Sequence, residues 1–479
     1  MDKVLQTRLE KLVHDTKEQY GLPSLTVSVS KGSDEFHYSI GAADLEEENK
    51  ATVNTVYCIG SSTKAFIALS LCILSEKGKI DLDMPVKTYL PNFEMYDEYS
   101  TEHLTIRDAL SHRSGLPRHD TSWLNTPERT TKEQVETLAF LPPAWPLRYR
   151  FHYQNHMFMV ATLLVEKVGG IPWGDFVKEN ILLPLGMNST YIYGDLIRDD
   201  DSRKARPYIN SGGQIYRIPY NYAKTSGGAG TMYSSTVDML KWLKFQLNGN
   251  GQVLGKEMLQ EMHSPQIIIR DGDIFNIMFP EIQFTSYGLA WFIESYRGQK
   301  IVHHGGTLDG FKSQQIFVPE KDIAISILCN LNQTTAVTSI GYAILDELMG
   351  FEPLDWMNRY IDASAKLSAE KIEETRDALK NANNMKSKCE NRDSYIGTYS
   401  NRAYGKAIVL ENDGQIYLQM IGLTLPIIPT GKDKFHLAVE SYGICFPVTF
   451  KRDETGKVTK LLIPLEESLK EAIPFYAED

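Results

Sequence analysis

Apolar residues follow a helical spacing at the start of the chain and then change to an alternating one. Leu5, Leu9 and Leu12 recur at intervals of three and four, which predicts an amphipathic helix. Segment 25–32 (LTVSVSKG) alternates apolar and polar residues and therefore predicts a strand, with segment 36–45 (FHYSIGAADL) as its hairpin partner.

The pattern changes again after Gly60. Residues 61–78 (SSTKAFIALSLCILSEKG) hold a run that is apolar on nearly every face, which predicts a buried helix within 59–74. Gly78 stands where the cap of that helix is expected. The opening order is therefore helix, strand, strand and buried helix.

The middle of the chain, from about residue 80 to residue 237, reads mostly as helices and loops, with helices predicted at 104–112 and 157–170. Strand patterns return in 286–306 and 313–330. Because the early and late strands can share one sheet, residues 1–353 are predicted to form an α+β domain with a mostly helical insertion.

The last part of the chain has a different composition. Residues 354–388 are rich in Lys, Glu, Ala and Asn and predict a solvated helical linker. Residues 389–479 hold short strand patterns separated by glycine-containing turns, which predicts a small all-β barrel as the C-terminal domain.

Composition and charge limit the classes of function. The 479 residues are 42% hydrophobic and 23% charged, with a net charge of −11, which is typical of a folded protein and argues against non-specific nucleic-acid binding. Five widely spaced cysteines indicate neither a disulfide framework nor a zinc ribbon. The longest apolar stretch, 65–74, is too short to span a membrane, and the charged N-terminus does not resemble a signal peptide, so a cytoplasmic protein is expected.

The first candidate for chemistry is the pair Ser61 and Lys64, at the start of the buried helix. Positions three apart share a helix face, so the hydroxyl and the amine can meet. A lysine acts as a base only when burial lowers its pKa, and the apolar run after Lys64 provides that setting. The alternative is a serine that only caps the helix and a lysine at the surface.

A second candidate lies in segment 148–161 (RYRFHYQNHMFMVA), just before an apolar helix. Tyr153 could relay protons, and Asn155 could orient a substrate carbonyl or the lysine. Packing of a loop is the alternative for these two residues.

A third candidate is the segment 303–306 (HHGG), at the end of a strand pattern. Adjacent strand residues point to opposite faces, so only one of His303 and His304 can reach a site. A zinc site would need a motif such as H-E-x-x-H, which is not present. Segment 226–232 (SGGAGTM) is glycine-rich, but it is not followed by the G-K-[ST] of a phosphate-binding loop. No metal and no cofactor are expected, and no G-x-S-x-G elbow of an α/β-hydrolase occurs.

Taken in order, Ser-x-x-Lys, Tyr-x-Asn and a strand with His-x-Gly resemble the signature of the serine β-lactamase and penicillin-binding-protein family. The similarity covers roughly residues 5–350 and is closest to the branch with class C β-lactamases, related esterases and D-aminopeptidases. Three further phrases match that branch, at 104–120, 184–190 and 227–243. The tail resembles the lipocalin-like C-terminal domain of some members.

This resemblance implies an antiparallel sheet flanked by helices, with a helical subdomain, followed by the barrel. It also implies that Ser61 is the nucleophile of an acyl-enzyme, with Lys64 and Tyr153 sharing the proton transfers and the identity of the acylation base left open. Asn155 would bind the substrate amide or the lysine, and the backbone N–H groups of Ser61 and Thr307 would form the oxyanion hole. His304 and Gly306 would complete the substrate-binding wall.

One departure from the family changes the expected substrate. Where β-lactamases and many penicillin-binding proteins have Lys-Thr-Gly, this chain has His304-Gly305-Gly306, and a neutral histidine is a poorer carboxylate anchor than a lysine. The expected substrates are therefore small esters, amides or D-amino-acid peptides. Acyl transfer, weak β-lactamase activity and a non-catalytic scaffold are the alternatives. A homo-oligomer is a further expectation, and neither nucleic acid nor a membrane span is expected.

Overall fold

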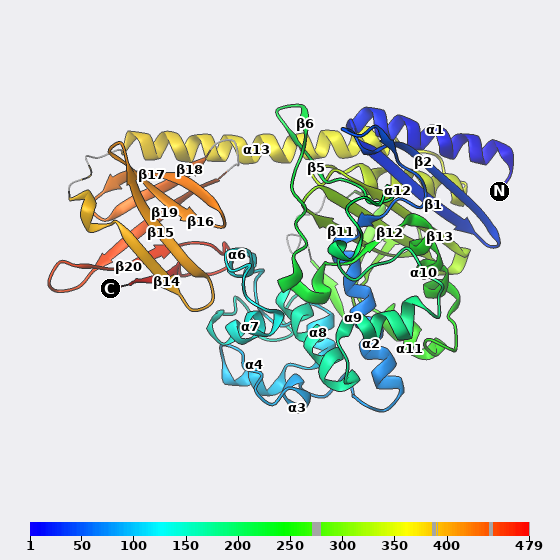
Figure 1. Ribbon diagram of the computed structural model, residues 1–479, viewed down its shortest axis with the longest axis horizontal. Helices are drawn as coiled ribbons and strands as arrows, with labels where there is room; N and C mark the ends of the chain where they lie inside the picture. The colour runs from blue at the N-terminus through cyan, green and yellow to red at the C-terminus, as the bar shows by residue number, and fades with distance from the viewer. Residues whose placement is uncertain (271–278, 386–388, 390, 440–443, 479) are drawn as a thin grey trace.

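The computed structural model describes residues 1–270, 279–385, 389, 391–439 and 444–478. Figure 1 shows a sheet with helices on both sides, a group of short helices beside it, and a separate barrel joined to the sheet domain by one long helix. The α+β domain and the C-terminal barrel predicted from the sequence are thus confirmed.

Within the described residues, the main sheet has nine antiparallel strands in the order β3-β2-β1-β13-β12-β11-β10-β9-β8. The first strand pairs with the last, so that Leu25 faces Cys329 and the two ends of the domain meet in the middle of the sheet. The bounds are β1 Ser24–Lys31, β2 Asp34–Asp44, β3 Asn49–Lys50, β8 Ile267–Ile269, β9 Ile282–Tyr287, β10 Phe292–Tyr296, β11 Gln299–Leu308, β12 Phe311–Val318 and β13 Ile323–Cys329.

Helices cover both faces of this sheet, which is why β1 and β13 are buried at nearly every position and not only at alternate ones. Helices α1 (Lys3–Tyr20) and α12 (Ala336–Met349) pack on one face, and α10 (Thr236–Asn248) packs on the other. The predicted buried helix is α2 (Lys64–Glu76), which packs against α8 (His156–Gly169). Its first turn differs from the prediction, because residues Gly60–Thr63 form a 3₁₀ turn before it.

Short helices make up the helical subdomain beside α8 (Figure 1). Their bounds are α3 Val86–Tyr89, α4 Glu98–His103, α5 Ile106–Leu110, α6 Asp120–Leu124, α7 Thr131–Glu136 and α9 Trp173–Val177. Helices this short are marginal alone. Helices α3, α5, α7 and α9 are stabilised by packing against α8, and α4 packs against α3.

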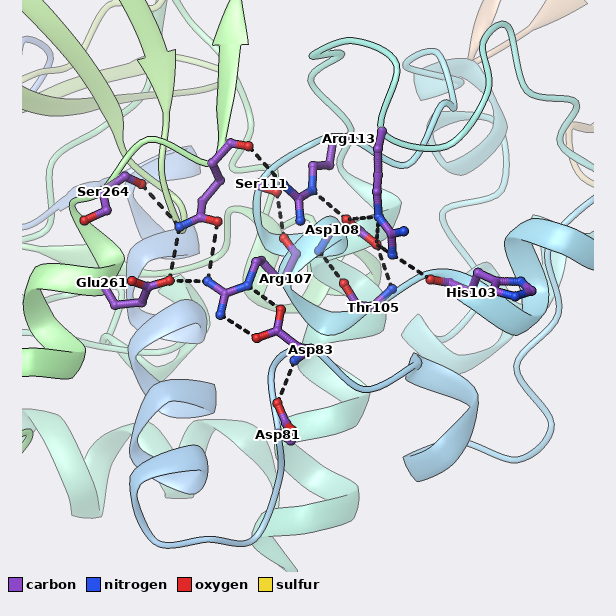
Figure 2. A network of polar contacts seen from close by, with 12 residues as sticks. Asp81, Asp83, His103, Thr105, Arg107, Asp108, Ser111, Arg113, Glu261 and Ser264 are labelled. Atoms are coloured by element: carbon purple, nitrogen blue, oxygen red, sulfur yellow. Dashed lines mark hydrogen bonds and ion pairs between the residues drawn. The ribbon is translucent and has the colours of Figure 1, made fainter.

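A network of ion pairs, shown in Figure 2, ties this subdomain to the rest of the domain. Arg107 of α5 donates to both oxygens of Asp83, at 2.6 and 2.8 Å, and pairs with Glu261 of α11 (Lys256–Met262). The fully buried carboxylate of Asp108 pairs with Arg113 at 2.5 Å and with Arg148 at 2.7 Å. The network therefore fixes α5 between α11 and the loops around it.

Helix α13 (Trp356–Asn384) leads to the C-terminal domain. Among the described residues, β14 to β21 form a closed eight-stranded barrel in chain order. The strands are β14 Gly397–Asn401, β15 Gly405–Asn412, β16 Gln415–Met420, β17 Leu423–Gly431, β18 Lys434–Val439, β19 Ile444–Arg452, β20 Val458–Ile463 and β21 Ile473–Ala477. The predicted boundary at residue 388 lies outside the described residues, and the domain limits stay predictions.

The barrel also contacts the helical subdomain directly, at the end of α6 (Figure 1). Asn125 Nδ2 donates to the carbonyl oxygens of Tyr404 and Lys406, at 2.7 and 2.8 Å, and Arg129 Nη1 donates to the carbonyl oxygen of Ala403 at 2.8 Å. The barrel is therefore held at two places, by α13 and by these contacts.

Two further features bear on the expectations from composition. The five cysteines, all within the described ranges, are free thiols. Of the described helices, none is both long and apolar enough to cross a bilayer.

Candidate active site

Ser61 lies in the 3₁₀ turn that leads into α2, beside the end of strand β11. Gly60 makes this position possible, since its φ is +50° and a Cβ there would lie 2.6 Å from the backbone nitrogen of Thr307. Gly306 is equally constrained, because its Cβ would lie 1.8 Å from the carbonyl oxygen of Ile59. The two glycines thus bring the backbone just before Ser61 against that of Thr307. Ser61 and Thr307 are the pair expected to form the oxyanion hole.

Lys64 is fully buried at the start of α2, and its amine faces three oxygens. Nζ lies 2.9 Å from Ser61 Oγ, 2.9 Å from Asn155 Oδ1 and 2.6 Å from the carbonyl oxygen of Ala229. Burial, followed by the charge of Arg118, holds the pKa of Lys64 well below its ordinary value. Lys64, which the sequence places one helical turn after Ser61, therefore has its amine inside the protein and in contact with the Ser61 hydroxyl.

Tyr153 and Asn155 come from the loop before α8, and both reach the same pair. Burial raises the pKa of Tyr153, and the Ser61 side chain near its phenol acts in the opposite direction but is outweighed. Its ring centroid lies 4.9 Å from Lys64 Nζ. Asn155 Nδ2 donates to Asp120 Oδ1 at 2.9 Å, so its amide oxygen faces Lys64.

The two adjacent histidines of β11 face opposite sides of the sheet, as alternation requires. His303 lies 3.2 Å from Glu294, away from the serine, whereas the His304 ring lies 6.2 Å from the Tyr153 ring. His304 Nδ1 donates to the carbonyl oxygen of Gly305 at 2.6 Å, which leaves Nε2 to accept from the Tyr287 hydroxyl at 3.0 Å.

His304 is thus a neutral residue of the site wall. Burial, and after it the nearby Lys64, lower the pKa of His304 to about 3. Both ring nitrogens already have partners within the protein, so neither is available to bind a substrate carboxylate.

Three contributors to the site lay beyond the sequence-based candidates. Ala229 binds Lys64 through its backbone carbonyl. A Cβ at the preceding Gly228 would lie 2.1 Å from the Ile67 side chain of α2, so a glycine there allows the close approach to α2. Arg118 and Asp120 lie in the segment that resembled the family, yet no role was assigned to them. Asp120 Oδ2 accepts from Arg118 Nε at 2.6 Å, and the guanidinium carbon of Arg118 lies 5.3 Å from the Tyr153 ring centroid.

The barrel brings one more carboxylate near this cluster. Glu466 follows β20, and its side chain is only 11% exposed. Burial, and then the charge of Asp120, raise the pKa of Glu466 to about 7. The described residues contain no group of three metal-ligating side chains near one another.

Comparison with known proteins gives this geometry a family context. A family model described as Beta-lactamase matches residues 9–348. The chain is 28% identical over 490 residues to an unguisins hydrolase, ungD′, of Aspergillus campestris, covering 96% of this chain and 89% of the relative.

Solved structures share the fold. A penicillin-binding protein homologue from Pyrococcus abyssi, described as octameric, superposes with a TM-score of 0.64 at 21% identity, covering 98% of this chain and 99% of that one. The D-amino acid amidase of Ochrobactrum anthropi superposes with a TM-score of 0.60 at 22% identity, covering 73% of this chain and 98% of that one.

Proposed function

Because the chain belongs to the beta-lactamase family, we propose that it is a serine hydrolase in which Ser61 forms an acyl-enzyme with an ester or amide substrate. The hydrolase class agrees with its relatives, an unguisins hydrolase and D-amino acid amidases. The observation that carries the serine mechanism is the set of three oxygens around Lys64 Nζ.

Burial favours a neutral Lys64 amine that accepts the proton of Ser61, and the oxygens around Nζ are compatible with this state. The Ala229 carbonyl and Asn155 Oδ1 can only accept hydrogen bonds, so they take the two hydrogens of a neutral Lys64 amine. The remaining lone pair then faces the Ser61 hydroxyl at 2.9 Å. The low pKa of this buried lysine, caused first by desolvation, supports the same protonation state.

Lys64 is therefore our acylation base, and Tyr153 is the general acid. Burial raises the pKa of Tyr153, so the phenol keeps its proton at neutral pH and can donate it to the leaving group. In the first step Ser61 Oγ bonds to the substrate carbonyl carbon while its proton passes to Lys64 Nζ. Tyr153 protonates the departing amine or alcohol and regains a proton from Lys64.

The backbone N–H groups of Ser61 and Thr307 are proposed to stabilise the tetrahedral oxyanion, each contributing about 3–4 kcal/mol to the transition state. Water, activated by the same amine, then attacks the acyl group and restores Ser61. Interception by an added amine or alcohol would make the enzyme an acyltransferase.

The substrate class follows from the wall of the site. Since both nitrogens of His304 are engaged, the anchor that a Lys-Thr-Gly motif offers to a β-lactam carboxylate is missing. We therefore propose amides and esters without that carboxylate, including D-amino-acid amides and peptide bonds. A homo-oligomer, as described for the Pyrococcus homologue, is part of the proposal.

A turnover panel tests this proposal. It compares p-nitrophenyl acetate, D- and L-phenylalanine amide and a chromogenic cephalosporin, with and without added hydroxylamine as an acyl acceptor. We expect hydrolysis of the ester and the D-amide, slow or no hydrolysis of the cephalosporin, and loss of activity by at least about 10³-fold in Ser61→Ala.

Intact mass spectrometry after rapid quenching should show a single acyl adduct in the wild-type chain and none in Ser61→Ala. Ser62→Ala is the matched control, because the neighbouring Ser62 hydroxyl contacts Ser313 and not Lys64. Equal turnover in wild type and Ser61→Ala, or an adduct on another residue, would overturn the proposal.

A further inference from the structure

His119 lies between two residues of the active-site cluster, Arg118 and Asp120, and points away from them into the contact with the barrel. Its side chain is fully buried, and its backbone has a φ of +50°, a left-handed conformation that costs energy for a residue with a side chain. Such a turn persists only where contacts around it hold it in place.

One of those contacts comes from the barrel. His119 Nε2 lies 2.9 Å from the carbonyl oxygen of Pro142, which can only accept, so this nitrogen carries the hydrogen of the neutral ring. Nδ1 must then accept, and the Tyr404 hydroxyl, at 2.5 Å, is its donor. The Pro142 carbonyl thus sets the tautomer of His119, and a barrel residue holds the ring through its other nitrogen.

The contact between Tyr404 and His119 forms where the barrel packs against the helical subdomain. Tyr404 stands in the turn between β14 and β15, and its backbone carbonyl accepts from Asn125. The Asn125 side chain also accepts from the backbone N–H of Ile421, between β16 and β17. Two turns of the barrel therefore hold Tyr404 against His119.

The position of His119 affects Lys64, the proposed base, through Arg118 and Asp120, the residues on either side of His119. Asp120 accepts from Asn155, whose amide oxygen binds Lys64, and Arg118 lies over the Tyr153 ring. A shift of this turn would therefore change both contacts at once.

The groups around His119 decide whether its ring stays neutral. Glu466 lies 4.0 Å from His119 Nδ1, and Asp120 is its neighbour in sequence. Burial, the largest cause, lowers the pKa of His119 to about 3. The Pro142 carbonyl and Asp120 act against this shift, whereas His156 and His152 add to it. The pKa of Glu466 is raised to about 7, so below that pH Glu466 carries a proton. If the Tyr404 hydroxyl were absent, a small movement of the Glu466 side chain toward Nδ1 would let it pass that proton to the ring and remain as the carboxylate partner of a protonated His119.

We propose that Tyr404 of the barrel is a positioning residue for catalysis, which holds the His119 ring through Nδ1 and keeps Asp120 and Arg118 in place beside Asn155 and Tyr153. The barrel is then part of the working active site and not an appendage. This inference rests on the proposed function, because it assigns a role in the reaction of Ser61 and Lys64.

The test removes one hydroxyl, in Tyr404→Phe, with Tyr476→Phe as the matched control because Tyr476 is an exposed barrel tyrosine. Initial rates with p-nitrophenyl acetate and D-phenylalanine amide are measured from pH 5 to pH 9. In Tyr404→Phe we expect kcat to fall about tenfold with KM nearly unchanged, the scale of one lost buried hydrogen bond. The acid limb of the pH profile should move to higher pH, since His119 gains a proton as the pH falls.

The double variant Tyr404→Phe/Glu466→Gln separates charge from packing. Without the carboxylate, a protonated His119 loses its partner, so the acid limb should move back toward the wild-type position. Glu466→Gln alone keeps the Tyr404–His119 contact and should leave kcat within about threefold of wild type, because the 4.0 Å separation is too long for a hydrogen bond.

Histidine titration by NMR gives a readout that does not depend on activity. The His119 signals, assigned by their loss in His119→Asn, should show a neutral ring down to pH 5 in wild type and a protonated ring at pH 5 in Tyr404→Phe. Unchanged titration, unchanged kcat, or the same changes in Tyr476→Phe would overturn the inference. If wild type hydrolyses nothing while the titration shifts as stated, the proposed function fails and the contact stands.

Discussion

The ion-pair network of Figure 2 and the proposed catalytic cluster both bury charged side chains, but they pair them differently. This cluster consists of Ser61, Lys64, Tyr153, Asn155, Arg118 and Asp120. In the network each charge meets its opposite directly, as Arg107 meets Asp83 and Asp108 meets two arginines. In the catalytic cluster the amine of Lys64 meets only neutral acceptors, and a neutral amide, Asn155, separates it from the nearest carboxylate, Asp120.

This difference in pairing distinguishes charged groups that stabilise the fold from a group suited to react. A directly paired buried charge keeps its ordinary ionisation state, and breaking the pair leaves the partner desolvated. A buried lysine without a carboxylate partner gives up its proton more easily, which is what a base requires. The same burial that costs folding energy at Lys64 therefore suits it to the proposed role of base.

The largest expected effect comes from Lys64→Met, which removes the base and leaves an apolar side chain of similar length. Hydrolysis should fall by about 10⁴-fold or more. The free energy of unfolding should stay equal or rise by about 1–2 kcal/mol, because no amine has to be buried. Turnover assays and urea denaturation check both parts, and a variant that is clearly less stable would show that Lys64 supports the fold.

Next in size is Asp108→Asn, which breaks the network. We expect a loss of about 3 kcal/mol in unfolding free energy, with turnover per folded molecule nearly unchanged. Burial tends to raise the pKa of Asp108, but Arg148 and Arg113 outweigh it and the pKa is lowered. This stabilisation is therefore present above the unfolded pKa of about 3.9 and is lost as the pH falls through the lower folded value.

Urea titrations at pH 7 and pH 3 measure that difference. Asp15→Asn, in the exposed pair with Lys11, is the control and should cost less than about 0.5 kcal/mol. Equal losses in the two variants would remove the distinction between buried and exposed pairs.

A smaller effect is expected from Asp120→Asn, in the catalytic cluster. Activity should fall by about tenfold. The amide oxygen introduced at position 120 can still accept from Asn155, but without a negative charge it makes a weaker hydrogen bond. Burial and Arg118 lower the pKa of Lys64, whereas Asp120 raises it, so removing the charge should move the acid limb to lower pH. A pH–rate profile checks the direction, and a shift to higher pH would mean that a group other than Lys64 sets the limb.

The smallest effect is expected from Tyr287→Phe, which removes the donor to His304 Nε2. We expect a loss of about 1 kcal/mol in stability and less than a threefold change in kcat. Thermal unfolding and ester hydrolysis measure these quantities. A large loss of activity would assign His304 a direct role in the reaction.

The sequence was sufficient for the parts of the molecule that depend on local pattern. Alternation predicted β1 and β2, the apolar run predicted α2, and regular turn spacing predicted the barrel. The pairs Ser61–Lys64 and Tyr153–Asn155 became candidates because spacing within one turn or one loop already limits where these side chains can meet, and their catalytic roles stay predictions.

Contacts between distant segments could not be predicted in this way. Ala229 acts through a backbone carbonyl, which any residue supplies, and Glu466 approaches Asp120 only because the barrel docks beside α6. Nor does the charge pattern of 104–120 reveal that Asp108 pairs within the network while Asp120 supports Asn155. Partner choice of this kind depends on the tertiary arrangement.

The length of α13 affects how changes at the α6 contact should be interpreted. Its 29 residues extend about 44 Å at 1.5 Å per residue, and it packs on α12 at one end and on β17, β18 and β19 at the other. Because α13 packs on both domains, it keeps the barrel at a high effective concentration next to α6. Weakening the α6 contact would therefore alter the orientation of the barrel by a rotation, without releasing it, and catalysis would respond in a graded manner.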